Sequence, residues 1–186
     1  MAKSALLVIE LQNDYLWDKR KSKFPYNTEQ LIAAANAAIH RMQTAGGDVI
    51  YLRQIFPDTP SNRIIFGFCI EDTEGAALSD DLQIVSAHCF DKNVADAYLD
   101  AAFAEFMNAQ GYTDIALCGI DEAGSIAATA KGAVHAGASV TILKDAVASR
   151  FPIGKLAPLR TELKALGIRY ESYQSDAFPP SHTINV

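Results

Sequence analysis

The run Ala-Leu-Leu-Val-Ile at residues 5–9 is the feature that most constrains the fold of this chain. Every side chain in it is apolar, so the segment has no polar face to turn toward water. This pattern is typical of a central strand in a parallel sheet that is covered on both faces. The run stops at Glu10. A carboxylate at that point lies at the carboxyl edge of the sheet, where ligands bind in such folds, although a solvated loop carboxylate is the plainer interpretation.

Strand-like and helix-like segments alternate along the chain, which predicts an α/β fold with a parallel sheet. The first helix is expected after Asn27, which acts as N-cap with Gln30 at the third helical position, and it ends before Gly46. Residues 53–80 are expected to be one long irregular loop, and such loops are more often functional than idle. The expected strands are residues 5–9, 48–52, 83–87, 113–117, 139–143 and 168–173, and the later helices are residues 95–109, 124–135 and 158–166.

Length and charge narrow the class of protein. A chain of 186 residues with a net charge of −6 can form one domain, and we expect that domain to span residues 1–186. An acidic chain argues against nucleic acid or an anionic membrane as partner. No apolar stretch approaches the roughly 20 residues of a membrane span, and we interpret residues 5–9 as a strand rather than a signal peptide. Three cysteines without a CxxC spacing are typical of a reduced, cytoplasmic protein.

Ser125 follows Gly124, where the strand at 113–117 leads into a helix of small residues. Its hydroxyl can cap that helix, and the free N–H groups nearby can bind an anion. The spacing of Gly119, Gly124 and Ser125 is similar to that of a phosphate loop, but the required lysine is absent after the second glycine. A structural cap and a functional hydroxyl therefore both stay open.

Three further polar side chains stand at or beyond strand ends. Lys92, just past the strand at 83–87, can hold a proton or bind an oxyanion, or it is a surface lysine. Gln54 and Arg63 lie in the long loop, and Arg63 can clamp a carboxylate through its planar fork unless it is simply a loop arginine.

The chain offers little for a metal or a nucleotide cofactor. Its four histidines follow no HxH, HExxH or DxH spacing, and there is no GxGxxG sequence. We therefore expect neither a metal nor a cofactor. The histidines are His40, His88, His135 and His182.

Five segments, in order along nearly the whole chain, resemble motifs of the isochorismatase-like hydrolase superfamily, also called the cysteine hydrolases. They correspond to the first strand with its acidic residue, a Thr-Glu-Gly loop, the catalytic-lysine segment, the nucleophile turn and an Asp-Ala motif. The resemblance implies a six-stranded parallel sheet in a three-layer α/β/α domain, assembled as a homodimer or homotetramer. The segments are residues 5–15, 72–78, 91–92, 119–130 and 144–150.

The resemblance also implies a triad of aspartate, lysine and cysteine. At these positions the present chain has Glu10, Lys92 and Ser125. Glutamate keeps the carboxylate but moves it by about one methylene, and a shift of roughly 1 Å matters in catalysis. Cysteine is a few per cent thiolate at neutral pH, whereas a serine hydroxyl needs a dedicated base.

A comparison with true isochorismatases supplies further candidate residues. Those enzymes protonate a vinyl ether with a carboxylic acid and have a small residue at the cysteine position. Gln54 resembles the glutamine of their Tyr-x-x-Gln segment, and Arg63 resembles their loop arginine. Asp121 stands where they have a tyrosine, and its charge would oppose a dicarboxylate substrate. We take Gln54, Arg63, Asp121 and Gly124 as candidate substrate-binding residues, for a substrate other than isochorismate.

Three interpretations follow for function. The first two are hydrolases of a small molecule, acting either on a vinyl ether with Ser125 as a small polar wall or on an amide with Ser125 as nucleophile. The third is an inactive family member that binds a ligand or partner. Cys118, seven positions before Ser125, is a conceivable displaced nucleophile, but we expect it to be buried, as free cysteines usually are.

Overall fold

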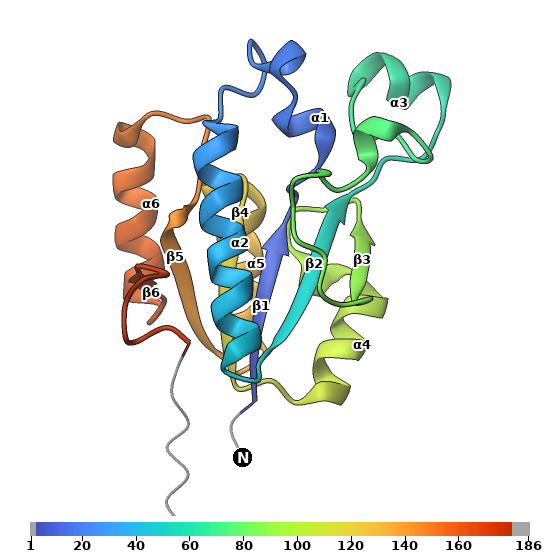
Figure 1. Cartoon of the computed structure of the whole chain (residues 1–186). Coiled ribbons are helices and arrows are strands. Elements are labelled where there is room, and N and C mark those ends of the chain that lie inside the picture. The colour runs from blue at the N-terminus through green and yellow to red at the C-terminus, as the bar shows by residue number, and fades with distance from the viewer. Residues whose placement is uncertain (1–2, 180–186) are drawn as a thin grey trace, which may run out of the picture.

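One parallel sheet of six strands, in the order β3-β2-β1-β4-β5-β6, forms the middle layer of the molecule (Figure 1). The structure is a computed structural model and describes residues 3–179. The predicted α/β/α class with a six-stranded parallel sheet is confirmed. The strands are β1 (Ser4–Ile9), β2 (Asp48–Gln54), β3 (Cys89–Lys92), β4 (Asp114–Gly119), β5 (Ser139–Val147) and β6 (Arg169–Glu171).

Helices cover both faces of the sheet. The helix α2 packs on one face, and α4, α5 and α6 contribute to the core on the other. No helix among residues 3–179 is both long and apolar enough to cross a membrane. The helices are α1 (Asn13–Leu16), α2 (Thr28–Thr44), α3 (Pro60–Ile65), α4 (Ala101–Gln110), α5 (Ala127–His135) and α6 (Ile153–Ala165).

The central strand β1 is buried on both sides, as its sequence predicts. Leu6 and Val8 join the core beneath α2, whereas Leu7 and Ile9 join the opposite core. All four side chains have no exposed surface. Burying a side chain of this size contributes about 1.5–3 kcal/mol, so β1 supplies a rigid base for the residues that follow it.

The strand order reverses between β1 and β4, and ligands bind at such a switch point in open α/β sheets. Ile9 and Gly119 lie opposite each other there. Gly119 has φ +114°, and a Cβ at this position would lie 2.0 Å from the carbonyl oxygen of Ile9. Only glycine allows this close approach, which brings the segments after β1 and β4 together.

The first helix begins as predicted. The side chain of Asn27 accepts a hydrogen bond from the backbone N–H of Gln30, and α2 ends at Thr44 before Gly46. The loop predicted at 53–80 begins later, because β2 continues to Gln54, which is a strand residue rather than a loop residue. The loop is also less irregular than expected, since it contains α3 and a short 3₁₀ turn, η2 (Glu74–Ala76).

The predicted third strand at 83–87 is wrong. These residues are irregular, and the strand lies instead at residues 89–92, so Lys92 is its last residue rather than a residue beyond it. At 83–87, hydrogen bonds from side chains take the place of backbone hydrogen bonds between strands. The Tyr51 hydroxyl donates to the Gln83 carbonyl, and the Ser86 hydroxyl donates to the Val49 carbonyl. The true strand is at the sheet edge and is half exposed, so its sequence lacks an apolar run.

Three predicted helices also differ at their starts, and the one expected at 124–135 begins at Ala127. The segment 95–109 divides at Asp100, whose side chain caps α4 by accepting from the N–H of Phe103. The helix predicted to begin at Pro158 begins at Ile153, with the proline inside it. The residue four positions earlier, Gly154, is exposed, so water can satisfy the carbonyl that the proline leaves without a donor.

Candidate active site

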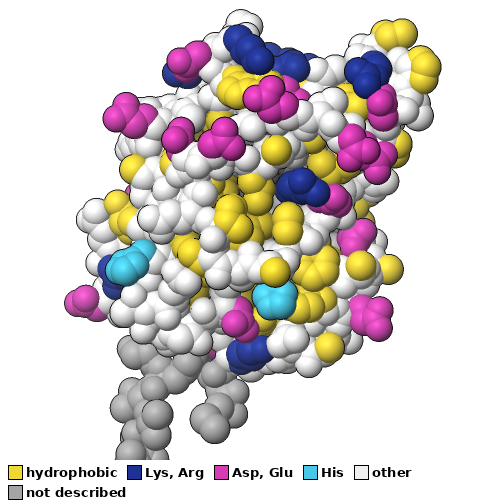
Figure 2. All heavy atoms as spheres, turned by 45° about the vertical axis from the view of Figure 1, so that its right-hand side comes forward, with side chains coloured by type: hydrophobic (Ala, Val, Ile, Leu, Met, Phe, Trp, Pro, Cys, Tyr) yellow, Lys and Arg dark blue, Asp and Glu magenta, His cyan; other side chains and the backbone are white. Residues whose placement is uncertain are grey.

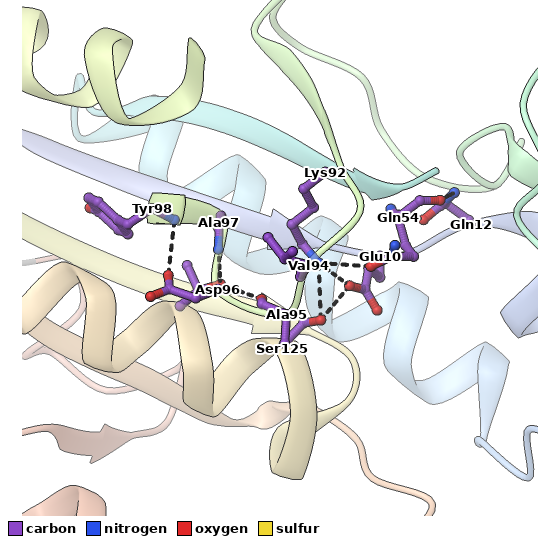
Figure 3. A network of polar contacts seen from close by, with 11 residues as sticks. Glu10, Gln12, Gln54, Lys92, Val94, Ala95, Asp96, Ala97, Tyr98 and Ser125 are labelled. Atoms are coloured by element: carbon purple, nitrogen blue, oxygen red, sulfur yellow. Dashed lines mark hydrogen bonds and ion pairs between the residues drawn. The ribbon is translucent and has the colours of Figure 1, made fainter. Parts of the chain in front are cut away.

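The side chains of Glu10, Lys92 and Ser125 meet at the carboxyl edge of the sheet, beside the switch point (Figure 3). Lys92 Nζ lies 2.5 Å from Glu10 Oε1, and the Ser125 hydroxyl donates to the same oxygen at 2.5 Å. Lys92 Nζ is 3.1 Å from Ser125 Oγ. Residues separated by up to 115 positions thus form one hydrogen-bonded cluster.

Each member is held by a different element. Glu10 follows β1 with φ 56°, a left-handed backbone conformation that residues other than glycine rarely adopt. Its N–H donates to the Leu52 carbonyl. Lys92 ends β3 and also donates to the Val94 carbonyl at 3.0 Å. Ser125 lies in a wide turn, η4 (Glu122–Ile126), that precedes α5.

Ser125 is not the helix cap that one interpretation of the sequence predicts. Asp121 caps the turn instead, because its Oδ1 accepts from the N–H of Ala123. Gly124 has φ −120° and ψ −111°, which breaks the helix just before Ser125. The peptide bond between Ile120 and Asp121 is cis. Because Asp121 caps the turn, the hydroxyl of Ser125 is free to bond with Glu10 rather than with its own helix.

The cluster is shielded from solvent but incompletely satisfied. The side chain of Lys92 is 1% exposed and that of Glu10 is 7% exposed. Among residues 3–179 no side chain donates to Glu10 Oε2, and Glu10 lines an adjoining cavity. A carboxylate that accepts from a hydroxyl can take its proton, and an adjacent ammonium stabilises the negative charge that develops.

Gln54 lines the same cavity and has an unpaired hydrogen-bond donor. Its side chain is buried, and Nε2 has no hydrogen-bond partner within the described part of the chain. Its Oε1 lies 3.4 Å from Lys92 Nζ. The buried side chain of Gln12 fixes the backbone here, since its Oε1 accepts from the Gln54 N–H and its Nε2 donates to the Gln54 carbonyl. An unpaired buried donor costs about 1–3 kcal/mol, which a ligand acceptor would recover.

The cavity beside the triad has a volume of about 230 Å³, and a separate cavity of about 380 Å³ lies beside Arg63. Six aromatic side chains, which we did not predict as site residues, line the triad cavity. Their clustering in segments 15–26 and 56–68, directly after β1 and β2, is a sequence signal that could have identified them. The six rings belong to Tyr15, Phe24, Tyr26, Phe56, Phe66 and Phe68.

The structure separates Arg63 from the other predicted site residues. Its guanidinium forms an ion pair with Asp58, at 2.5 Å and 2.7 Å, and it lines the cavity beside Asp14 and Arg20. Asp121 and Gly124, in contrast, line the triad cavity. The geometry therefore brings together every predicted site residue except Arg63.

Cys118 does not reach the site. It lies in β4 with no exposed surface and does not line the triad cavity. Burial raises the pKa of its thiol to about 12, so it carries almost no thiolate at neutral pH. Among residues 3–179 no group of three or more histidine, cysteine or acidic side chains is arranged to hold a metal ion.

Residues 4–161 match the family model described as the isochorismatase domain. The chain belongs to the isochorismatase family. This match extends from β1 into α6 and includes all three members of the triad. No curated protein sequence matches the chain.

Solved structures share the fold over almost the full length. N-carbamoylsarcosine amidase from Thermoplasma acidophilum is 19% identical with a TM-score of 0.78, covering 93% of this chain and 98% of that one. A nicotinamidase from Bacillus subtilis is 19% identical with a TM-score of 0.77, covering 91% and 99%. Pyrazinamidase of Pyrococcus horikoshii, solved in complex with zinc, is 23% identical with a TM-score of 0.73, covering 91% and 99%. At these identities the likeness shows the isochorismatase-like hydrolase fold.

Proposed function

We propose that this isochorismatase-family protein hydrolyses the C–N bond of a small amide, with Ser125 as nucleophile and Glu10 as general base. The observation that carries the proposal is the hydrogen bond from Ser125 Oγ to Glu10 Oε1. A nucleophile and a base within hydrogen-bond reach, beside a cavity, form the arrangement that nucleophilic catalysis requires. The amidases among the structural neighbours are consistent with this reaction.

The proposed reaction has two stages. Ser125 Oγ forms a bond to the amide carbon while its proton moves to Glu10, and the carbonyl oxygen becomes an oxyanion. When the C–N bond breaks, Glu10 returns that proton to the leaving amine, and an acyl ester of Ser125 remains. A water molecule then attacks the ester with Glu10 as base, which releases the carboxylic acid and the free hydroxyl.

Lys92 and Gln54 have supporting roles in this proposal. The ammonium of Lys92, 3.1 Å from Ser125 Oγ, stabilises negative charge at that oxygen and holds Glu10 in place. The free Nε2 of Gln54 donates to the substrate carbonyl oxygen. Both groups are fixed before substrate binds, so little reorganisation is needed in the transition state.

A second reaction, the hydrolysis of a vinyl ether, is supported by Glu10 Oε2. This oxygen accepts no side-chain hydrogen bond within residues 3–179, and Glu10 faces the cavity. In its protonated form Glu10 would protonate the substrate carbon directly. Ser125 would then act only as a small polar part of the wall.

A screen of small amides and enol ethers, followed by Ser125→Ala, tests the proposal. Amide turnover by the wild type should fall by a factor on the order of 10³ or more in Ser125→Ala, and Ser125→Cys should retain it. Turnover of an enol ether that is unchanged in Ser125→Ala would favour the vinyl-ether reaction. Ser79→Ala is the matched control, because Ser79 is 8% exposed and Ser125 is 7% exposed, but Ser79 does not line the cavity.

Absence of turnover throughout the screen would contradict the hydrolase proposal. It would support the alternative in which the protein is an inactive ligand-binding or interaction protein. Lys92→Ala gives a second check, since turnover that belongs to this site must disappear when the ammonium is removed.

We also propose that the protein acts in the cytoplasm as a homodimer or homotetramer, without a cofactor. Its three cysteines are free, which fits a reducing compartment. Ile64 and Ile65 of α3 are 84% and 66% exposed, and a subunit contact would cover such apolar side chains. A nucleic-acid partner is not part of this proposal, because on the face drawn in Figure 2 basic and acidic side chains are interspersed rather than gathered into a basic patch. Light scattering would measure the assembly, and a monomer would contradict it.

A further inference from the structure

The triad cavity has one cationic side chain in its wall, Arg150, among the residues that the structure describes. Arg150 is exposed, so it lies at the opening of the cavity rather than at its base. Its guanidinium forms no ion pair with any acidic side chain of residues 3–179, and its Cζ lies 5.3 Å from the centroid of the Phe151 ring. A charge of this kind is available to a ligand.

The backbone of Arg150 is fixed although its guanidinium is free. Its N–H donates to Asp121 Oδ2 at 2.8 Å, and the Tyr26 hydroxyl donates to the same oxygen at 3.0 Å. Asp121 Oδ1 accepts from the N–H of Ala123 and from the hydroxyl of Ser149. Asp121 therefore ties the turn that carries Ser125 to the segment that carries Arg150.

These contacts also distribute the charges around the cavity. The charge of Glu10 is matched by Lys92 at 2.5 Å, and the carboxylate of Asp121 accepts four hydrogen bonds. The four donors to Asp121 are neutral, so its charge is solvated by hydrogen bonds, whereas the guanidinium of Arg150 has neither an ion pair nor a hydrogen bond within residues 3–179. An anion at the opening can therefore bind it bidentately, as carboxylates bind arginine.

From these contacts we infer that Arg150 binds the anionic group of the substrate and that the substrate is a planar, ring-bearing carboxylate. The ring lies among the six aromatic side chains, the carboxylate meets Arg150 at the opening, and the bond to be cleaved lies at Ser125. The cavity of about 230 Å³ suits a small ring rather than a polymer. The assignment of the bond to Ser125 rests on the proposed hydrolase function.

A cationic ligand is the competing possibility, because aromatic side chains also surround quaternary ammonium groups. The charges in the wall disfavour it. Both acidic side chains of the wall already have hydrogen-bond donors, whereas a ligand cation would meet the unpaired guanidinium of Arg150.

Binding of three probes of the same size tests the inference without requiring turnover. We would titrate the full chain with benzoate, benzamide and benzylammonium and follow binding by NMR. Benzoate should bind the wild type about tenfold more tightly than benzamide, which corresponds to about 1.4 kcal/mol. Added salt should reduce this preference, because the ion pair lies at an exposed opening.

Arg150→Gln should abolish the preference for benzoate, and Arg150→Lys should retain part of it, since lysine keeps the charge but loses the planar fork. Arg63→Gln is the matched control and should leave the preference intact, because Arg63 lines a different cavity and is paired with Asp58. The circular dichroism spectrum and melting temperature of each variant verify folding.

The inference fails if the wild type binds benzamide or benzylammonium as tightly as benzoate. It also fails if Arg63→Gln, rather than Arg150→Gln, removes the preference. Failure of the hydrolase proposal gives a different result, in which benzoate binding depends on Arg150 but no ring-bearing amide or enol ether is turned over.

Discussion

Two buried glutamates, Glu10 and Glu122, each form an ion pair with a cation, yet their surroundings differ. Glu122 is 1% exposed, and both of its oxygens are occupied. Arg160 donates to Oε1 and Oε2 at 2.7 Å each, and the Tyr170 hydroxyl donates to Oε1 at 3.2 Å. This carboxylate joins η4 to α6 and β6, and it does not line the triad cavity.

Glu10 is almost as buried, with 6% of the whole residue exposed, but its hydrogen bonds are concentrated on one oxygen. Lys92 and Ser125 both bond to Oε1. The residue also has a left-handed backbone and faces the cavity. The difference teaches that burial and an ion pair do not by themselves indicate catalysis. A carboxylate with every acceptor occupied stabilises the fold, whereas one with a free oxygen and a donor nucleophile can react.

The largest expected difference between the two glutamates is in turnover. Glu10→Gln should reduce kcat on a substrate found by the screen by about 10²–10⁴-fold, because the amide cannot take the proton of Ser125. Glu122→Gln should leave kcat within about tenfold of the wild type, since Glu122 does not contact the triad. Steady-state kinetics below the melting temperature of both variants measure this. Equal losses would show that the distinction between the two sites is false.

The two cations should differ in their contribution to stability. Arg160→Met leaves the charge of Glu122 buried with only Tyr170 as partner, and should lower the free energy of unfolding by about 3 kcal/mol. Lys92→Met should cost less, because Glu10 faces the cavity and can gain water there. Urea unfolding with linear extrapolation measures both values. A larger loss in Lys92→Met would mean that Glu10 depends on its cation more than Glu122 does.

The smallest effect concerns the tyrosine beside each glutamate at high pH. Burial raises the pKa of Tyr15, and the charge of Glu10 adds to this effect. Burial likewise raises the pKa of Tyr170, with Glu122 as the next cause. In both cases the folded state keeps a proton that the unfolded state loses above its ordinary pKa of 10.0. The stability that these groups contribute is therefore present below pH 10 and falls as the pH rises above it.

Tyrosinate absorbance during an alkaline titration checks this expectation. Tyr170 is partly exposed and should ionise before Tyr15, which is 7% exposed. Glu122→Gln should lower the pKa of Tyr170 and leave that of Tyr15 unchanged. Glu10→Gln should lower the pKa of Tyr15 and of Tyr26, whose pKa the charge of Glu10 also raises, and leave that of Tyr170 unchanged. Tyr15→Phe and Tyr170→Phe identify the two signals. A shift of both Tyr15 and Tyr170 in either variant would contradict the separation of the two sites.

Local patterns were sufficient for the centre of the fold. The apolar run at 5–9 predicts β1, and Asn27 predicts the start of α2. Glu10, Lys92 and Ser125 were predicted as site residues from motifs that occur in the family's order along the chain, and the structure brings their side chains together. Their catalytic roles stay predictions. The third strand was misplaced because edge strands are half exposed and lack the apolar run that marks a buried strand.

The amino-acid sequence by itself determined the alternation of buried strands and helices, and hence an α/β sheet with polar residues at its carboxyl edge. Only the tertiary structure decided which charges remain free. Arg63 and Arg150 are both loop arginines in the sequence, but one is paired with Asp58 and the other lies unpaired at the triad cavity. Pairing of charges depends on distances between segments far apart in the chain, and local sequence patterns do not specify those distances.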